Sequence, residues 1–197
     1  MNALTEMLMS QLAGSAISQI SGKIGADPGT TSKAVAIAVP LLISALARNS
    51  STPAGAEALN NAVARDHDGS ILDNLGAFLG NSESANGAKI LGHVLGGRRT
   101  DVENGLAQST GLDSGAAGQL LETIAPLVMG ALGKTQQQEG LDANGLSEYL
   151  DSQHQQAQAS APDVMGMLGS LLDSNKDGSV LDDVGRIAGR LFSRSTH

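Results

Sequence analysis

The sequence predicts an all-α protein, a bundle of short packed helices with an internal duplication. Apolar residues recur at three- and four-residue spacing along the 197-residue chain, which is the period of helices with one buried face. No segment alternates convincingly as a strand would, and the aromatic residues that favour strands are only 2% of the composition. Clusters of Gly and Ser interrupt the apolar pattern repeatedly, so we expect the helices to be short.

The expected helices follow from this spacing in chain order. Leu4, Leu8 and Leu12 share one face of a first helix over residues 3–14. The apolar run 34–47 indicates a buried helix over 30–48, since the run is shorter than the ~20 residues that span a bilayer and contains a proline. The remaining helices are expected near residues 55–64, 71–80, 86–95, 100–108, 114–134, 143–150, 163–172 and 180–192.

Two repeats indicate the duplication. Gly25-Ala-Asp27-Pro-Gly29 matches Gly111-Leu-Asp113-Ser-Gly115, and an apolar run with an internal proline, Pro40 or Pro126, follows each copy at the same spacing. In both copies we expect the Asp to cap a helix and the proline to kink it. Further along, Asp66–Gly76 matches Asn175–Gly185.

The repeats divide the chain into two related helical halves, residues 1–97, including linking helices, and residues 98–197. The polar, Gln/Ala-rich stretch near residues 151–162 is expected to be a loop or linker within the second half. The two halves are also compatible with one compact domain.

The segment 173–183 has the spacing of an EF-hand-type calcium loop. Side-chain oxygens stand at loop positions 1, 3 and 5, a glycine permits the turn at position 6, and a carbonyl follows at position 7. Position 12 is Val184 in place of a bidentate acid, so one of two nearby acids would have to close the loop. The candidate calcium ligands are Asp173, Asn175, Asp177, Ser179, Asp182 and Asp183. The same residues are also explained as an Asp-Gly turn followed by a helix-capping box.

A weaker copy of this acidic loop contains Asp66, Asp68 and Asp73. Its first position is Ala64, so we expect a turn and a helix cap here, with Ser70 as the N-cap residue and Asp73 three residues on.

Other chemistry-bearing residues are expected to have structural roles. His67, between two aspartates, is expected in solvent, and His93, on an apolar helix, in the core or at an interface. The basic pair Arg98 and Arg99 is expected at a helix C-terminus. The glutamates fall on different expected helices, so no general acid and base can be paired among Glu57, Glu103, Glu122 and Glu148.

Composition excludes several functions. The absence of Cys excludes disulfides and thiolate metal sites, and the absence of Trp with one Tyr and two Phe argues against base stacking. A net charge of −8 argues against binding of nucleic acid. No Lys or Arg precedes Lys23, so the N-terminus does not read as a secretory signal, and we expect a cytoplasmic protein without a membrane partner.

Four motifs resemble the YidB-like bacterial family, a domain of unknown function. They are Ile90–Gly97, Gly111–Asp113, Leu127–Leu132 and Asp177–Asp183, and the resemblance extends over roughly residues 25–192. It implies an all-α fold of short packed helices, and it implies neither an established activity nor any catalytic residue.

The expected function is that of a non-enzymatic structural or interaction protein. Ala/Gly-rich helices offer flat apolar faces, so we expect a homo-oligomer or a complex with an unknown protein partner. The alternative is a calcium-stabilised or calcium-responsive binding module that uses residues 173–183, with calcium as the one expected cofactor. A third hypothesis is an enzyme in which Glu122, His93 and an Asp from an acidic loop meet in one cleft.

Overall fold

The computed structural model describes residues 3–80 and 85–160, and every regular element in these ranges is helical, which confirms the all-α fold class. In chain order the elements are α1 (Ala3–Leu12), α2 (Ser15–Ile24), α3 (Pro28–Ser50), α4 (Pro53–Asp66), α5 (Ser70–Asp73), α6 (Leu75–Gly80), α7 (Ala85–Leu95), the 3₁₀ turn η1 (Gly96–Arg98), α8 (Arg99–Thr110), α9 (Ser114–Glu139) and α10 (Ala143–Ser160).

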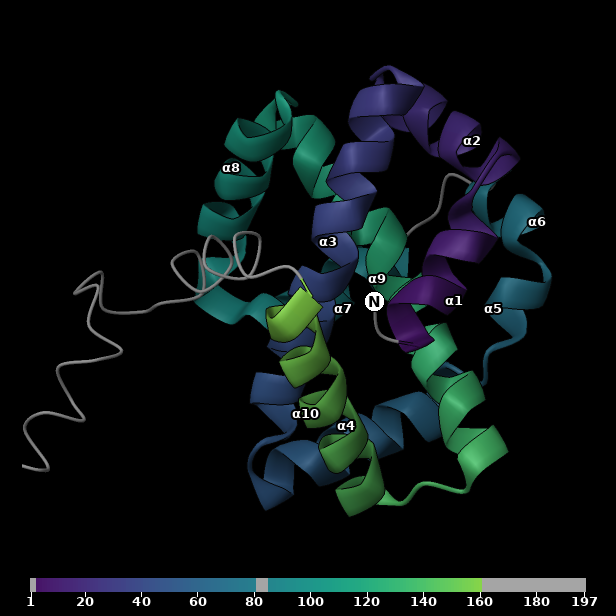
Figure 1. Cartoon of the computed structure of the whole chain (residues 1–197), viewed down its shortest axis with the longest axis vertical. Helices are drawn as coiled ribbons and strands as arrows, with labels where there is room; N and C mark the ends of the chain where they lie inside the picture. The colour runs from purple at the N-terminus through teal and green to yellow at the C-terminus, as the bar shows by residue number, and fades with distance from the viewer. Residues whose placement is uncertain (1–2, 81–84, 161–197) are drawn as a thin grey trace, which may run out of the picture.

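The long helices α3 and α9 form the centre of the fold (Figure 1). They pack on each other, and the shorter helices pack around them. One contiguous apolar core includes residues from α1 through α10, so both predicted halves contribute to it. By length and composition, α3 and α9 could each cross a membrane, but 67% and 83% of their most apolar stretches are buried in the fold, as is usual for core helices.

The predicted aspartate caps of α3 and α9 are confirmed. The side chain of Asp27 accepts a hydrogen bond from the backbone N–H of Thr30 at 3.0 Å, and Asp113 accepts one from Ala116 at 2.9 Å. Each carboxylate satisfies an N–H group that has no partner within its helix.

The same Gly-x-Asp pattern also precedes α10. Gly140 has a positive φ of 66° and ends α9, and Asp142 then accepts a hydrogen bond from the N–H of Gly145 at 2.8 Å. Because the same cap occurs before three helices, it is a local feature of the helix connections in this fold. It does not by itself establish the predicted duplication, whose second acidic copy lies outside the described residues.

One helix was not among those expected, and one stretch that was expected to be a loop is helical. Residues 15–24 form α2, where Ala16, Ile20 and Ile24 are buried at four-residue spacing among polar neighbours. The polar stretch from residue 151 continues α10 as far as Ser160, so the loop prediction is wrong there. This part of α10 is helical because it packs on α3 and α4, where Gln153 is buried.

Glycines set how closely α4 and α7 approach α9. A Cβ atom added at Gly87 in α7 would lie 2.0 Å from the carbonyl oxygen of Glu122 in α9. Pro126 has no N–H to offer that carbonyl, so the oxygen is free to face the glycine. At the end of α4, a Cβ added at Gly133 in α9 would lie 1.7 Å from the carbonyl oxygen of His67. Both contacts bring helix backbones together and place α4 and α7 on the same side of α9.

Candidate functional site

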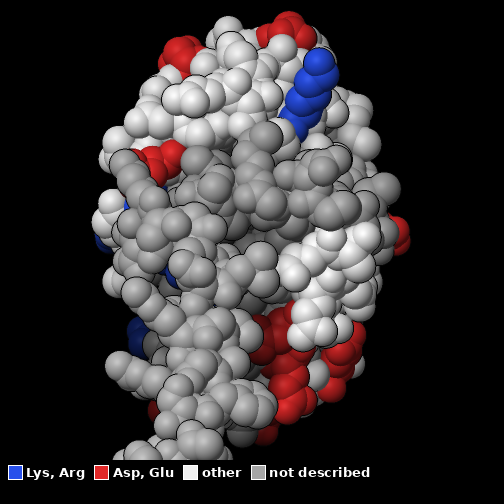
Figure 2. Space-filling view, turned by 60° about the vertical axis from the view of Figure 1, so that its left-hand side comes forward, with Lys and Arg blue, Asp and Glu red and all other residues white. Residues whose placement is uncertain are grey.

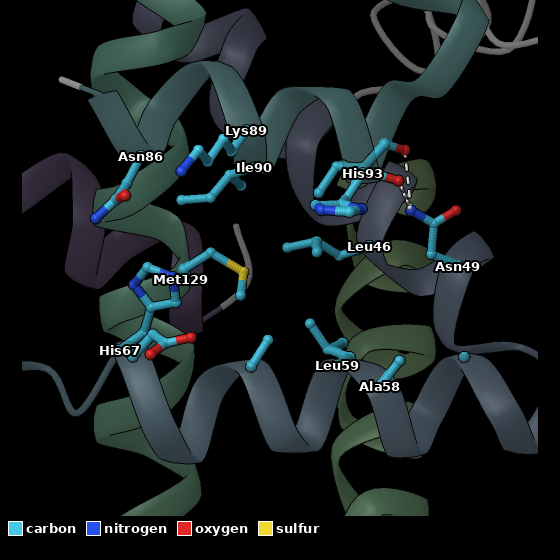
Figure 3. A pocket seen from close by; sticks show the side chains of 14 residues that line it. Leu46, Asn49, Ala58, Leu59, His67, Asn86, Lys89, Ile90, His93 and Met129 are labelled. Carbon is cyan, nitrogen blue, oxygen red and sulfur yellow. Dashed lines mark hydrogen bonds between the residues drawn. The ribbon is translucent and has the colours of Figure 1, made fainter.

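A cavity of about 780 Å³ lies between α4 and α7, with α3 and α9 contributing to its base (Figure 3). The two walls pack on α3 and α9 and have little direct contact with each other, so a gap remains between them. The lining residues are Leu46, Asn49, Gly55, Ala58, Leu59, Ala62, Asp66, His67, Asn86, Lys89, Ile90, His93, Val94 and Met129.

One face of each wall helix supplies most of this lining. In α7, Asn86, Lys89, Ile90 and His93 follow three- and four-residue spacing and therefore point to the same side. The facing side of α4 carries mainly glycine, alanine and leucine, and these small side chains leave the space open. A typical ligand pocket has a similar lining, mostly apolar with a few polar groups.

The two ends of the cavity differ. Asp66, His67 and Asn86 also line a smaller cavity of about 250 Å³, so they stand where the two spaces meet. At the opposite end, the side-chain amide of Asn49 donates to the carbonyl oxygens of His93 and Val94, at 3.3 and 2.9 Å, and ties the end of α7 to α3. We call the end with Asp66, His67, Asn86 and the neighbouring Lys89 the polar end.

Both histidines of the cavity differ from expectation. His93 is exposed and points into the cavity, so it does not lie in the core, while the alternative place at an interface stays a prediction (Figure 3). His67 is half-buried where a solvated side chain was expected. Burial lowers the pKa of His67, while the carboxylates of Asp66 and Asp68 act in the opposite direction. A neutral imidazole offers a ligand one N–H donor and one acceptor nitrogen.

The carboxylates of the weaker acidic loop make separate contacts. Asp68 accepts a hydrogen bond from the N–H of Ser70 at 3.0 Å, and hydrogen bonds from the side chain and then the backbone of Ser70 lower the pKa of Asp68. Asp73 instead pairs with Lys134 at 3.0 Å, and Asp66 lines the cavity. Within residues 3–80 and 85–160, no three His, Asp or Glu side chains gather as metal ligands. In this part of the chain the three carboxylates of Asp66, Asp68 and Asp73 have separate contacts and do not gather around one point, so metal binding by this second loop stays a prediction.

The predicted capping box in this loop is also incorrect. Ser70 is the first residue of α5, and Gly69, with a φ of 90°, occupies the N-cap position. Asp68 supplies the capping carboxylate from one residue earlier.

The stronger candidate calcium loop, residues 173–183, lies outside the described residues. Calcium binding there stays a prediction. The cavity between α4 and α7 is therefore the candidate site within the described residues.

A family model described as a bacterial protein of unknown function, DUF937, matches residues 6–135. The chain belongs to this family. The YidB-like resemblance is consistent with it, although the match begins earlier and ends sooner than the expected span of 25–192. Searches of curated proteins and of solved structures returned no match. All lining residues of the cavity fall inside the part of the chain that matches DUF937, whereas the candidate calcium loop falls outside it.

An ion cluster in this DUF937 domain could not be read from the sequence. Arg99 donates to Glu103 at 2.6 Å and also to Glu122, and these bonds raise the pKa of its guanidinium. Arg99 begins α8, so the expected helix C-terminus at this position is wrong. Arg99 and Glu103 have the four-residue spacing of helical ion pairs, so this pair could have been predicted from the sequence. The contact with Glu122 could not, because Glu122 comes from a different helix. Glu122 is not among the residues that line the cavity with His93.

Proposed function

We propose that this DUF937 protein is a non-enzymatic cytoplasmic binding domain that holds a small, largely apolar ligand between α4 and α7. The cavity carries the proposal. Its volume of about 780 Å³ falls within the ~300–1,000 Å³ usual for ligand sites, and its lining combines eight apolar or glycine residues with six polar ones. Its position inside the region that matches the family supports a role for the domain itself rather than for the C-terminal segment.

The chemistry of the lining supports binding rather than catalysis. No Ser, Thr, Tyr or Cys lines the cavity, so the hydroxyl and thiol nucleophiles of covalent catalysis are not supplied there by the described residues. The side chains of His67 and His93 also form no hydrogen bond within that part of the chain. A general base that acts on a nucleophile is normally oriented by such a bond.

Self-association, with a homo-oligomer as its product, stays a prediction of the sequence. Three of the helical glycines have partners inside the molecule: Gly87 and Gly133 face backbone carbonyls of neighbouring helices, and Gly130 packs against Ile71. We therefore rank the cavity above assembly through these helices. Size-exclusion chromatography with light scattering tests the assembly directly.

Surface charge supports a function without nucleic acid. Among the described residues on the face in Figure 2, acidic side chains lie at the upper end and form their largest group toward the lower end, and basic side chains are few. Together with the net charge of −8, this distribution offers little to a phosphate backbone.

A neutral fluorescent probe tests the proposed function. We expect N-phenyl-1-naphthylamine to bind the full chain with a saturable rise in fluorescence, and the absence of Trp keeps the protein background low. Ala58→Phe fills the cavity from the exposed wall of α4 and should weaken binding by about tenfold or more, equivalent to ~1.4 kcal/mol.

Ala54→Phe is the matched control, because Ala54 is exposed on the same helix but does not line the cavity. It should bind the probe as the parent chain does, and helical circular dichroism should be equal in all three proteins. Absence of saturable binding, or equal weakening by both substitutions, would refute the proposed function.

A further inference from the structure

Two side chains of opposite charge face the polar end of the cavity from opposite walls. Lys89 projects from α7 (Figure 3), and Asp66, the last residue of α4, also lines the cavity. Both are exposed, and neither forms an ion pair or a hydrogen bond through its side chain within residues 3–80 and 85–160. An ammonium and a carboxylate that line one space without pairing to each other leave both charges available to a ligand.

The polar end holds one formally positive side chain, Lys89, and one formally negative side chain, Asp66. The titratable side chains that face it are Asp66 and His67 from α4 and Lys89 and His93 from α7, and the lining residues of α3 and α9 add none. Burial lowers the pKa of His67, which favours its uncharged form. One positive and one negative group therefore remain at the polar end, together with the neutral amide of Asn86.

The wall beside the polar end is apolar. Leu59 and Met129 are buried, and Ile90 is half-buried one residue beyond Lys89. A ligand with its charged head at Lys89 and Asp66 would lay its body against these three side chains, where apolar contact contributes about 25 cal/mol per Å² removed from water.

We propose that the polar end binds a zwitterionic head group on an apolar body, its carboxylate beside Lys89 and its ammonium beside Asp66. A short apolar peptide with free termini has this chemistry. The inference rests on the proposed function, since it names the class of ligand that the cavity takes. A purely anionic head group at the polar end would lie near the like charge of Asp66. A purely cationic one would lie near the like charge of Lys89.

Four forms of one dipeptide separate the two charges. Dileucine carries both, dileucine amide only the ammonium, N-acetyl-dileucine only the carboxylate, and N-acetyl-dileucine amide neither. Binding to the full chain is measured at pH 7 by NMR titration. We expect dileucine to bind most tightly, loss of either charge to weaken binding about threefold, and loss of both about tenfold, as for partly exposed ion pairs.

Substitutions assign each charge to its partner. Lys89→Met should bind dileucine and dileucine amide equally, because the ligand carboxylate no longer has a cation to meet. Asp66→Asn should bind dileucine and N-acetyl-dileucine equally. Lys33→Met and Asp101→Asn remove exposed charges that do not line the cavity, and they should preserve the full pattern of the parent chain.

The outcomes separate this inference from the proposed function. Equal affinity for the four forms, or binding of N-phenyl-1-naphthylamine without binding of dileucine, overturns the zwitterion assignment and leaves the apolar cavity as the site. Loss of the charge pattern in Lys33→Met also overturns it. Failure of the fluorescent probe to bind with saturation refutes the proposed function itself.

Discussion

At single residues, the missing side chains of glycine decide how closely the helices of this domain pack. Gly87 lies against the carbonyl oxygen of Glu122, and Gly133 lies against that of His67. A Cα–H group that faces a carbonyl contributes only a weak attraction. The larger effect is steric, since any side chain would push the wall helices α4 and α7 away from α9.

Gly87→Ala should therefore destabilise the fold. The added Cβ would meet backbone atoms, which cannot rotate away, and we expect the free energy of unfolding to fall by about 2–3 kcal/mol in urea denaturation. Gly92 is the matched control: it lies in the same helix with nothing within 4 Å of its added Cβ. Gly92→Ala should be neutral or stabilising by up to about 1 kcal/mol. If the two variants unfold alike, the close approach of α7 to α9 is wrong.

Among the elements, α10 is held to α3 by side-chain hydrogen bonds. Ser44 donates to the carbonyl oxygen of Pro40 at 2.8 Å, so its oxygen accepts from Nδ1–H of His154 at 2.9 Å. The other ring nitrogen of His154 then accepts from Gln158 at 2.8 Å. Near the other end of α10, Ser147 donates to the carbonyl oxygen of Ser50 at 2.8 Å. These contacts require the neutral imidazole with its proton on Nδ1.

This interface should weaken in mild acid. Burial lowers the pKa of His154 from its ordinary 6.5, with Arg48 acting in the same direction and Asp151 in the opposite one. As the pH falls through 6.5, the unfolded chain takes up a proton before the folded protein does, so the free energy of unfolding falls. His154→Gln should lose less stability than the parent chain between about pH 8 and pH 5.

The comparison needs a second variant, because burial also lowers the pKa of His67 and acts in the same direction. His67→Gln should flatten the pH profile separately, and the double variant more than either. Urea denaturation at each pH measures the profiles. A His154→Gln profile parallel to that of the parent chain would show that α10 does not hold this histidine neutral.

At the scale of the whole molecule, residues 3–80 and 85–160 share one apolar core to which α1 through α10 contribute, and the candidate calcium loop follows them in the sequence. The match to DUF937 ends at residue 135, well before that loop. Calcium binding would therefore be an addition to the family domain rather than part of it.

If residues 173–183 bind calcium, added calcium should raise the melting temperature of the full chain, and a chelator should reverse the rise. Binding to the folded state alone stabilises by RT ln(1 + [L]/Kd), about 2.7 kcal/mol at a hundredfold excess over Kd. Asp173→Ala combined with Asp177→Ala should abolish the effect, while Asp66→Ala combined with Asp68→Ala should retain it. A melting curve indifferent to calcium would leave this loop as a turn and a helix cap.

Several features of the fold could be predicted because their causes are local. The all-α class follows from the apolar spacing, and the caps at Asp27 and Asp113 follow from a carboxylate just ahead of an apolar helix. The loop prediction failed in the second half of α10, where packing on distant helices overrode local polarity.

The sequence by itself determined that the apolar runs of this protein are helical. It also determined where two of the long helices begin. Only the tertiary structure decided the site. The cavity joins residues from α3, α4, α7 and α9, and its width depends on backbone contacts at Gly87 and Gly133. Helical spacing and capping act within about four residues, whereas the packing that brings Asp66 opposite Lys89 is set by helices far apart in the chain.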